Sequence, residues 1–136
     1  MILVDTSVWV DFFNGNESNK TEQLEHFLSS TVIIVGDLIL AELLQGFRKD
    51  KDYQTAKSLL QECQLVQLCN IELAIKSAQN YRILRKQGIT IRKTIDNIIA
   101  TYCIENSIPL LFSDRDFEPF VSHLNLKDAS KLNQQK

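Results

Sequence analysis

The 136-residue chain is poor in glycine, proline and cysteine, with four Gly, two Pro and three Cys. Together with 44% hydrophobic and 24% charged residues, this excludes low-complexity, collagen-like and disordered chains. The three cysteines form an odd set without a CxxC spacing, which disfavours a disulfide framework or a zinc ribbon. His26 and His123 are far apart and lack an HExxH context, so hard cations held by oxygen suit this chain better than zinc.

Long hydrophobic runs are also missing. The apolar opening Met1–Val4 ends at Asp5, which makes it too short for the core of a signal peptide. No stretch approaches the roughly 18 apolar residues that a membrane span requires. We therefore expect a cytoplasmic protein. The sequence also lacks GxxxxGK[ST], GxGxxG and GxSxG motifs, which excludes nucleotide-loop enzymes and leaves nothing to support a serine hydrolase.

Short apolar runs alternate with amphipathic stretches along the chain. The runs predict buried strands, and the helical periodicity of the stretches predicts helices. The expected strands cover residues 1–5, 31–35, 64–68 and 108–112, and the expected helices cover residues 8–13, 22–29, 37–46, 52–62, 72–87 and 94–106. This alternation indicates a single three-layer α/β domain with a mostly parallel central sheet flanked by helices. We expect the domain to span residues 1–125, followed by a loose polar C-terminal tail over residues 126–136.

The helix expected over residues 72–87 carries apolar residues at helical spacing. We expect its buried face to consist of Leu73, Ala74, Ala78, Tyr81 and Leu84.

Carboxylates occur where a folded protein seldom places a charge. Asp5 ends one apolar run, Glu42 interrupts a second, Asp96 lies within a third, and Asp114–Asp116 follows a fourth. A buried carboxylate without a partner is costly, so it becomes neutral or meets a cation. Asp5 and Asp114 each follow a predicted parallel strand, and ligands of such sheets bind beyond the carboxyl ends of the strands. The pattern therefore predicts that these acids share one rim.

Each acid also has a simpler interpretation. Asp5 can be a helix N-cap, although Thr6 and Ser7 are able to cap in its place. Glu42 can reach solvent or pair with a nearby arginine such as Arg48. Asp96 can be an exposed residue of an amphipathic helix, and Asp114–Asp116 can be turn acids.

The simple interpretations weaken when the acids are taken together. Two unit charges about 4 Å apart repel by roughly 4 kcal/mol at an effective dielectric constant of 20. Several such pairs are a heavy burden for a domain whose stability is about 5–15 kcal/mol. A divalent cation reverses the sign of this energy. The cluster thus predicts a Mg²⁺ or Mn²⁺ site for phosphoryl chemistry.

The net charge of −2 first argues against a nucleic-acid ligand. If Asp5, Glu42, Asp96 and Asp114 are set aside under a metal, however, 15 basic residues face the 13 acids that remain of 17. Five basic residues gather over residues 82–93. Such a run is usually a solvated face, but beside a metal site it can hold a polyanion. The candidate RNA-binding residues are Arg85, Lys86, Arg92 and Lys93.

The four acidic segments resemble, in order and spacing, the four motifs of the PIN domain. They read MILVDTS at residues 1–7 with Trp9 beyond, LAEL at residues 40–43 with Gly46 beyond, TIDNIIA at residues 94–100, and LFSDRDF at residues 111–117. The resemblance covers residues 1–125. Chain length and motif order are similar to those of the small prokaryotic PIN proteins of the VapC type, the ribonuclease toxins of toxin–antitoxin pairs.

This resemblance implies a site and a chemistry. Asp5, Glu42, Asp96 and Asp114 correspond to the catalytic, metal-binding acids, with Asp5 and Asp96 as the more dependable direct ligands. Thr6 or Ser7 matches the hydroxyl beside the first acid, and Asp116 matches a further acid of some members. The implied enzyme is a Mg²⁺-dependent endoribonuclease, with Mn²⁺ as an alternative ion. Hydrolysis by water would leave 5′-phosphate and 3′-hydroxyl ends.

The resemblance also implies partners, namely an RNA substrate, a cognate antitoxin and a second copy of the chain in a homodimer. Trp9, Phe12, Phe13 and the stretch Leu43–Phe47 offer apolar surface for such contacts, although core packing also explains them.

Three other functions fit parts of the pattern. A haloacid-dehalogenase-type phosphohydrolase needs a second aspartate two residues after the first, where this chain has Ser7. A response-regulator receiver needs adjacent acids near the first strand and a lysine after a late strand, which the chain does not clearly supply. A non-catalytic acidic module that binds only a protein partner or a metal remains the main alternative to an enzyme.

Overall fold

A computed structural model describes residues 1–135, with side chains described up to residue 132. Its centre is a four-stranded sheet in the order β3-β2-β1-β4, and every pairing is parallel. The strands are β1 (Ile2–Val4), β2 (Ile33–Gly36), β3 (Gln64–Val66) and β4 (Leu110–Leu111). The prediction of a three-layer α/β domain is confirmed, and the sheet is wholly parallel.

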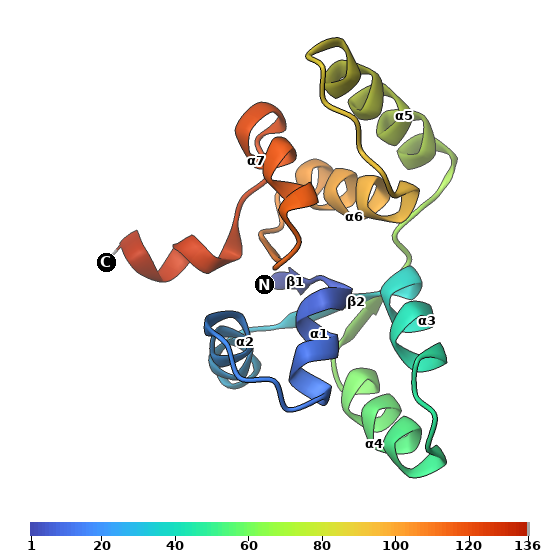
Figure 1. The fold of residues 1–136 in the computed structure, drawn as a ribbon, viewed down its shortest axis with the longest axis vertical. Coiled ribbons are helices and arrows are strands. Elements are labelled where there is room, and N and C mark those ends of the chain that lie inside the picture. The colour runs from blue at the N-terminus through green and yellow to red at the C-terminus, as the bar shows by residue number, and fades with distance from the viewer. Residues whose placement is uncertain (136) are drawn as a thin grey trace.

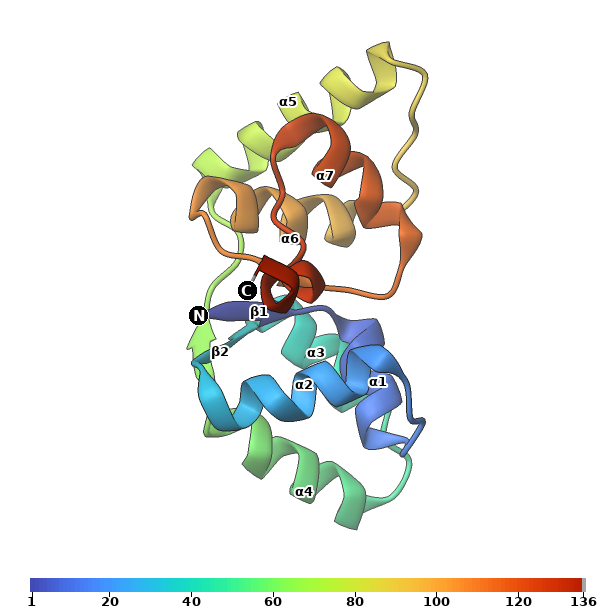
Figure 2. The ribbon, with the colours of Figure 1, turned by 90° about the vertical axis from the view of Figure 1, so that its left-hand side faces the viewer.

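Seven α-helices cover the two faces of the sheet over the described residues (Figures 1 and 2). They are α1 (Thr6–Phe13), α2 (Asn19–Ser30), α3 (Asp37–Gln45), α4 (Asp50–Gln61), α5 (Ile71–Lys86), α6 (Thr94–Glu105) and α7 (Glu118–Leu124). Figure 2 shows α1 to α4 on one side of the sheet and α5 to α7 on the other. Within residues 1–135, no helix has the length and apolar character needed to cross a membrane.

Two elements near the C-terminus were not expected from the sequence. The short 3-10 helix η1 (Arg115–Phe117) leads directly into α7, which has a proline in its first turn. Proline is favoured there because the first helical N–H groups have no partner within the helix. The side chains of Phe117 and Phe120 are fully buried and anchor η1 and α7 to the core.

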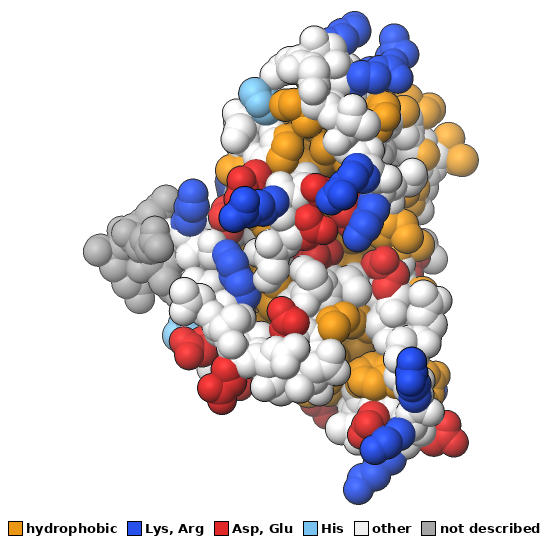
Figure 3. All heavy atoms as spheres, in the orientation of Figure 1, with side chains coloured by type: hydrophobic (Ala, Val, Ile, Leu, Met, Phe, Trp, Pro, Cys, Tyr) orange, Lys and Arg blue, Asp and Glu red, His pale blue; other side chains and the backbone are white. Residues whose placement is uncertain are grey.

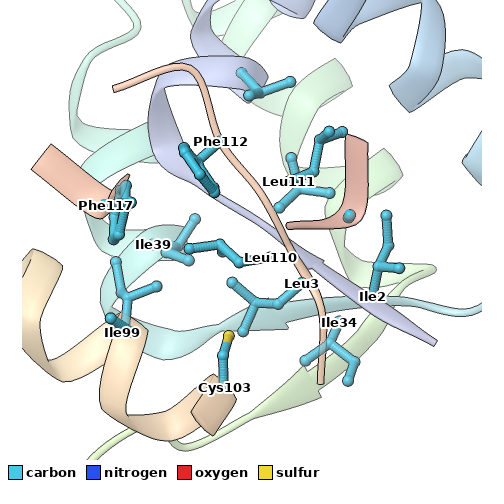
Figure 4. Close-up of a cluster of buried hydrophobic side chains, with 14 of the residues drawn as sticks. Ile2, Leu3, Ile34, Ile39, Ile99, Cys103, Leu110, Leu111, Phe112 and Phe117 are labelled. Carbon is cyan, nitrogen blue, oxygen red and sulfur yellow. The ribbon is translucent and has the colours of Figure 1, made fainter. Parts of the chain in front are cut away.

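The core lies on both sides of β1, the inner strand that pairs with β2 and β4. Figure 4 shows Leu3, Leu110 and Ile34, from three adjacent strands, near Ile99 and Cys103 of α6. All five side chains are almost completely buried. Burial on both faces explains why the strands read as uninterrupted apolar runs.

The turn from β2 into α3 is held by a close approach of the chain after β3. The carboxylate of Asp37 accepts hydrogen bonds from the backbone N–H of Leu38 (2.9 Å) and of Leu68 (3.0 Å). A Cβ atom on Gly36 would overlap the Leu68 side chain. These contacts fix the start of α3, the helix that carries Glu42.

The buried face of α5 agrees only in part with the predicted one. Leu84 is buried and Leu73 and Tyr81 are half-buried, as predicted, but Ala74 and Ala78 are exposed and Ser77 and Asn80 face inward. Buried polar contacts with α6 decide this orientation: Asn80 Nδ2 donates to Thr101 Oγ1 (3.0 Å), and Asn97 Nδ2 donates to the Ser77 carbonyl (2.8 Å). Polar groups that can pair across a helix interface are satisfied only when they face each other. The opposite face of α5 is left apolar and exposed.

The segment that follows residue 125 is not loose where it is described. Leu126 is 3% exposed and Ala129 is fully buried. The backbone N–H of Leu110 donates to the Lys127 carbonyl (2.9 Å), and Leu110 forms a parallel bridge with Asp128. The 3-10 helix η2 (Ala129–Gln135) follows. The prediction of a loose tail from residue 126 was therefore wrong, because this segment covers the free side of β4; residue 136 lies outside the described residues.

Candidate metal centre

The first acid stands at the end of β1. The backbone N–H of Asp5 donates to the Leu111 carbonyl (2.9 Å), so the ends of β1 and β4 are side by side. Asp5 is also the N-cap of α1: its Oδ2 accepts from the N–H of Ser7 (3.3 Å) and from the Ser7 hydroxyl (2.7 Å). The idea that Thr6 or Ser7 would cap the helix instead of Asp5 was wrong. The cap holds the carboxylate in place at the rim.

Asp114 comes after β4, separated from it by Phe112 and Ser113. It is the N-cap of η1, and its Oδ1 accepts from the backbone N–H of Asp116 (2.9 Å). The turn interpretation is therefore correct as far as local structure goes. The same turn brings a second carboxylate, that of Asp116, back toward the rim.

Glu42 reaches the rim from α3. Its Oε1 accepts a hydrogen bond from the Thr6 hydroxyl (2.8 Å), and it makes no ion pair with Arg48, which is exposed. The suggested Glu42–Arg48 pair is absent among the described side chains. Thr6, which directly follows Asp5, therefore connects the glutamate to the start of α1.

Asp96 is the most buried of the acids after Asp5. It lies in the first turn of α6 and is 8% exposed, and its Oδ2 is buried without any hydrogen-bond partner among the described residues. The positive end of the helix dipole favours a carboxylate at this position. The unpartnered oxygen still carries the cost of losing its hydration. The interpretation of Asp96 as an exposed helix residue was wrong.

Three of the carboxylates converge, and Asp5 and Glu42 lie outside this closest group. Ligand oxygens of Asp96, Asp114 and Asp116 all lie within 4.8 Å of one another. Burial raises the pKa of Asp96 to about 6, with further contributions from the charges of Asp5, Asp114 and Glu42, while Lys93 lowers it. Figure 3 shows acidic side chains gathered in the middle of this face, with basic side chains on either side.

The pKa of Asp5 is raised as well. Burial is the main cause and the charge of Glu42 adds to it, whereas the hydrogen bonds from Ser7 lower the pKa. Carboxylates held in this way bind protons more readily than usual, because a proton or a cation relieves the repulsion. The carboxylates whose charge a proton would neutralise here are therefore the same ones that a metal ion would stabilise.

The four candidate RNA-binding residues separate into two pairs. Arg92 and Lys93 are exposed and directly precede α6 at the rim, and Arg92 forms an ion pair with Asp116. Arg85 and Lys86 are exposed in the last turn of α5. That end of α5 lies far from the sheet in both views (Figures 1 and 2). The structure therefore places only the first pair beside the acids.

The set of ligands is suited to a hard divalent cation. The Asp96, Asp114 and Asp116 triad offers only carboxylate oxygens, and no thiol or imidazole belongs to it. Mg²⁺ and Mn²⁺ prefer such ligands, whereas zinc sites favour sulfur and nitrogen. Asp96 belongs to this triad, and its buried Oδ2, which has no hydrogen-bond partner among the described residues, would be satisfied by a cation. An α/β domain with an acidic rim at the ends of its strands is thus the class of protein that fold and site define.

Comparison with known proteins agrees with this geometry. The PIN domain model matches residues 2–120. The VapC ribonuclease Mb1587 of Mycobacterium bovis and the ribonuclease VapC11 of Mycobacterium tuberculosis are each 30% identical over 135 residues, covering 96% of this chain and 98% of theirs. The chain therefore belongs to the PIN domain family, as one of its VapC-type members.

Solved structures show the same fold. VapBC2 from Rickettsia felis, bound to a DNA fragment from its promoter, aligns with a TM-score of 0.73 at 20% identity, covering 93% of this chain and 96% of that one. VapBC-1 from nontypeable Haemophilus influenzae aligns with a TM-score of 0.70 at 20% identity and the same coverage. At this level of identity the likeness concerns the fold.

Proposed function

We propose that this protein is a Mg²⁺-dependent endoribonuclease, with Mn²⁺ as an alternative ion, and that it is the toxin of a toxin–antitoxin pair. The observation that carries the proposal is the convergence of carboxylates around Asp96, whose buried Oδ2 has no partner among the described residues. The ribonuclease names of the VapC relatives support the choice of RNA as substrate.

Several residues of the chain are proposed to bind the ion, each in a different way. Asp96, Asp114 and Asp116 supply carboxylate oxygens that lie within 4.8 Å of one another, and Oδ2 of Asp96 has no partner among the described residues. Asp5 and Glu42 add negative charge from β1 and α3, and Thr6 orients Glu42 through its hydroxyl. When bound, a divalent cation lowers the pKa of water and neutralises charge on phosphate oxygens. Removing a carboxylate should weaken both binding and catalysis.

Arg92 and Lys93 are proposed to hold the RNA backbone beside this cluster. Both are exposed, and they stand at the start of the helix that carries Asp96. A guanidinium pairs with phosphate oxygens through two parallel hydrogen bonds, whereas an ammonium acts as a compact charge. The contacts would position the backbone without reading bases.

Water is proposed as the attacking group, in place of the ribose 2′-hydroxyl. Cleavage would then leave 5′-phosphate and 3′-hydroxyl ends. Mass spectrometry of the products tests this directly, because 2′,3′-cyclic phosphate ends would show that the 2′-hydroxyl attacks.

The decisive test of the nuclease compares RNA decay with Mg²⁺ and with EDTA for the wild type, Asp5→Asn and Asp96→Asn. Glu25→Gln is the matched control, because Glu25 is an exposed residue of α2. Decay is expected only for the wild type and Glu25→Gln in Mg²⁺. Equal decay in every arm would reject the metallonuclease. Absence of decay together with retained partner binding would favour a non-catalytic interaction module.

An antitoxin is proposed to bind an apolar groove next to Glu42. The groove has a volume of about 150 Å³ between α1 and α3, and its lining includes Val10, Phe13 and Phe47. The Phe13 and Phe47 rings meet edge to face, with centroids 5.7 Å apart. Of the apolar residues expected to offer contact surface, Trp9 is fully buried and belongs to the core.

Three of the solved neighbours are described as VapBC, and another is described as a toxin–antitoxin complex from Klebsiella pneumoniae. Co-expression with the product of an adjacent gene, followed by copurification, tests the partner. Phe47→Ser should abolish copurification and leave RNA cleavage intact. If Phe47→Ser still copurifies with the partner and still cleaves RNA, the groove is not part of the interface.

A homodimer is proposed to form through the exposed face of α5. Ile71 is 80% exposed and Ile75 is 57% exposed, and with Ala74 and Ala78 they follow the i, i+3, i+4, i+7 spacing of one helical stripe. This stripe lies opposite the buried Ser77 and Asn80. A two-fold axis would place the same stripe of two copies face to face.

A further inference from the structure

Asp116 belongs to the acidic triad, yet its carboxylate forms an ion pair with an arginine. Arg92 Nη2 donates to Asp116 Oδ1 (3.2 Å) and Oδ2 (3.0 Å), and Arg92 Nε donates to Oδ2 (3.2 Å). Both oxygens of this carboxylate therefore face a guanidinium. It is the only ion pair among the side chains that the structure describes.

The same oxygens are within reach of a metal ligand set. Asp116 contributes an oxygen that lies within 4.8 Å of those of Asp96 and Asp114. The buried Asp96 Oδ2, which has no partner among the described residues, is an independent observation that points to a ligand of this cluster. A cation bound there would sit close to the Arg92 guanidinium. Two positive groups on one carboxylate repel each other, so the arginine and the metal compete for Asp116.

The Arg92 side chain can move away from Asp116 at little energetic cost. Its side chain is 74% exposed, whereas that of Asp116 is 21% exposed and its backbone is fixed in η1 by the hydrogen bond to Asp114. An exposed ion pair contributes little to stability, so its exchange is inexpensive. A phosphodiester offers a guanidinium the same two-oxygen geometry as a carboxylate.

We propose that Arg92 is a positioning residue that transfers from Asp116 to a backbone phosphate of the RNA, and that this transfer releases Asp116 to bind the metal. RNA and metal then strengthen each other's binding, and by linkage the strengthening is equal in both directions. Without RNA, the ion pair keeps the metal site incomplete. The inference rests on the metal-dependent cleavage proposed above.

The test is a calorimetric titration with Mn²⁺ in the absence of RNA. The variants are Arg92→Gln, Asp116→Asn, the double variant and the control Arg82→Gln, which changes another exposed arginine of the same basic run. Arg92→Gln should bind Mn²⁺ roughly three- to ten-fold more tightly than the wild type. Arg82→Gln should match the wild type. Asp116→Asn should bind more weakly, and adding Arg92→Gln to it should change nothing.

A second arm adds a mixed-sequence RNA with a phosphorothioate backbone, which resists cleavage. This RNA should tighten Mn²⁺ binding to the wild type, but not to Arg92→Gln or Asp116→Asn. In cleavage assays, Arg92→Gln should raise the KM for RNA while it lowers the Mg²⁺ concentration needed for half-maximal rate. A merely structural defect would not move these two quantities in opposite directions.

The outcomes separate the two proposals. If no variant, including the wild type, binds Mn²⁺, the proposed metal site fails and this inference fails with it. If the wild type binds Mn²⁺ but Arg92→Gln binds it no more tightly, the exchange is wrong while the metal site stands. A gain from Arg92→Gln that persists in the Asp116→Asn background would also overturn the exchange, because the arginine would then act through another group.

Discussion

The Thr6 hydroxyl donates a 2.8 Å hydrogen bond to Glu42 Oε1, joining the first turn of α1 to α3 across the rim of the sheet. Glu42 has no other hydrogen bond among the described residues, so Thr6 alone sets the direction of its carboxylate. Residues that orient metal-binding side chains commonly contribute ten- to hundred-fold to affinity or activity.

Thr6→Val should therefore lower kcat for RNA by about ten- to hundred-fold, because the valine has a similar shape but no donor. Thr6→Ser keeps the hydroxyl and should retain most of the activity. Single-turnover cleavage rates measure both variants. A Thr6→Val enzyme as active as the wild type would show that Glu42 does not need this contact.

The stability of the metal-free protein should fall as pH rises from about 4 to about 6. The pKa of Asp96 is raised from 3.8 to about 6 in the folded protein, mainly by burial. Below pH 3.8 this carboxyl is protonated in both states and costs nothing. As pH rises through the window, the unfolded chain loses the proton first, so ionisation favours unfolding until the loss is complete above pH 6.

Thermal unfolding in EDTA at several pH values measures this effect. The difference between wild type and Asp96→Asn isolates the contribution of Asp96 from that of the other acids. Affinity for Mg²⁺ should rise with pH over the same range, because a protonated carboxyl does not bind the ion. A pH-independent difference between the two proteins would contradict the raised pKa.

Asp96→Asn should make the metal-free protein more stable at pH 7.5, although it removes a proposed catalytic group. The substitution replaces a buried charge that is repelled by Asp5, Asp114 and Glu42. We expect the melting temperature in EDTA to rise by about 3–6 °C. Mg²⁺ should raise the melting temperature of the wild type by mass action, and raise that of the variant less. The exposed Glu25→Gln control should show neither change.

Charge on the α5 stripe should prevent self-association. Ile75→Glu places a carboxylate in the middle of the proposed symmetric contact, where it would face its own copy. Ile83→Glu is a matched control, since Ile83 is 43% exposed on the same helix but lies off the stripe. Sedimentation velocity should show a monomer for Ile75→Glu and a dimer for the wild type and Ile83→Glu. A monomeric wild type would reject the homodimer.

The general position of the candidate site followed from the sequence for a definite physical reason. In a parallel sheet the carboxyl ends of all strands lie at one edge, so Asp5 and Asp114 had to share a rim once their strands were predicted. Asp96 and Glu42 followed from the cost of placing a carboxylate among apolar neighbours. The proximity of Asp116 to Asp96 depends on the 3-10 helix η1, whereas the sequence suggested only a turn at these acids.

Contacts between residues that are far apart in the sequence could not be predicted from the periodicity of apolar residues. The orientation of α5 depends on Asn80 meeting Thr101, which is 21 residues away, and an apolar pattern alone placed Ala74 and Ala78 on the buried face in place of Ser77 and Asn80. The pairing of Arg92 with Asp116 joins residues 24 apart, through side chains that are independently unremarkable. The burial of Leu126 likewise depends on the vacant side of β4. A single sequence shows which residues need partners, but not which partners they find.

The segment beyond residue 125 holds the edge of the sheet in place. By bonding to Leu110 it covers an edge strand that would otherwise offer unpaired backbone groups to other chains. Gln23 Nε2 of α2 donates to the Ser130 carbonyl (3.1 Å), which fastens the same segment to the opposite helical layer. Because only Phe112 and Ser113 link β4 to Asp114, removal of this segment by a protease should disturb the acidic rim without cutting any of the residues that form it.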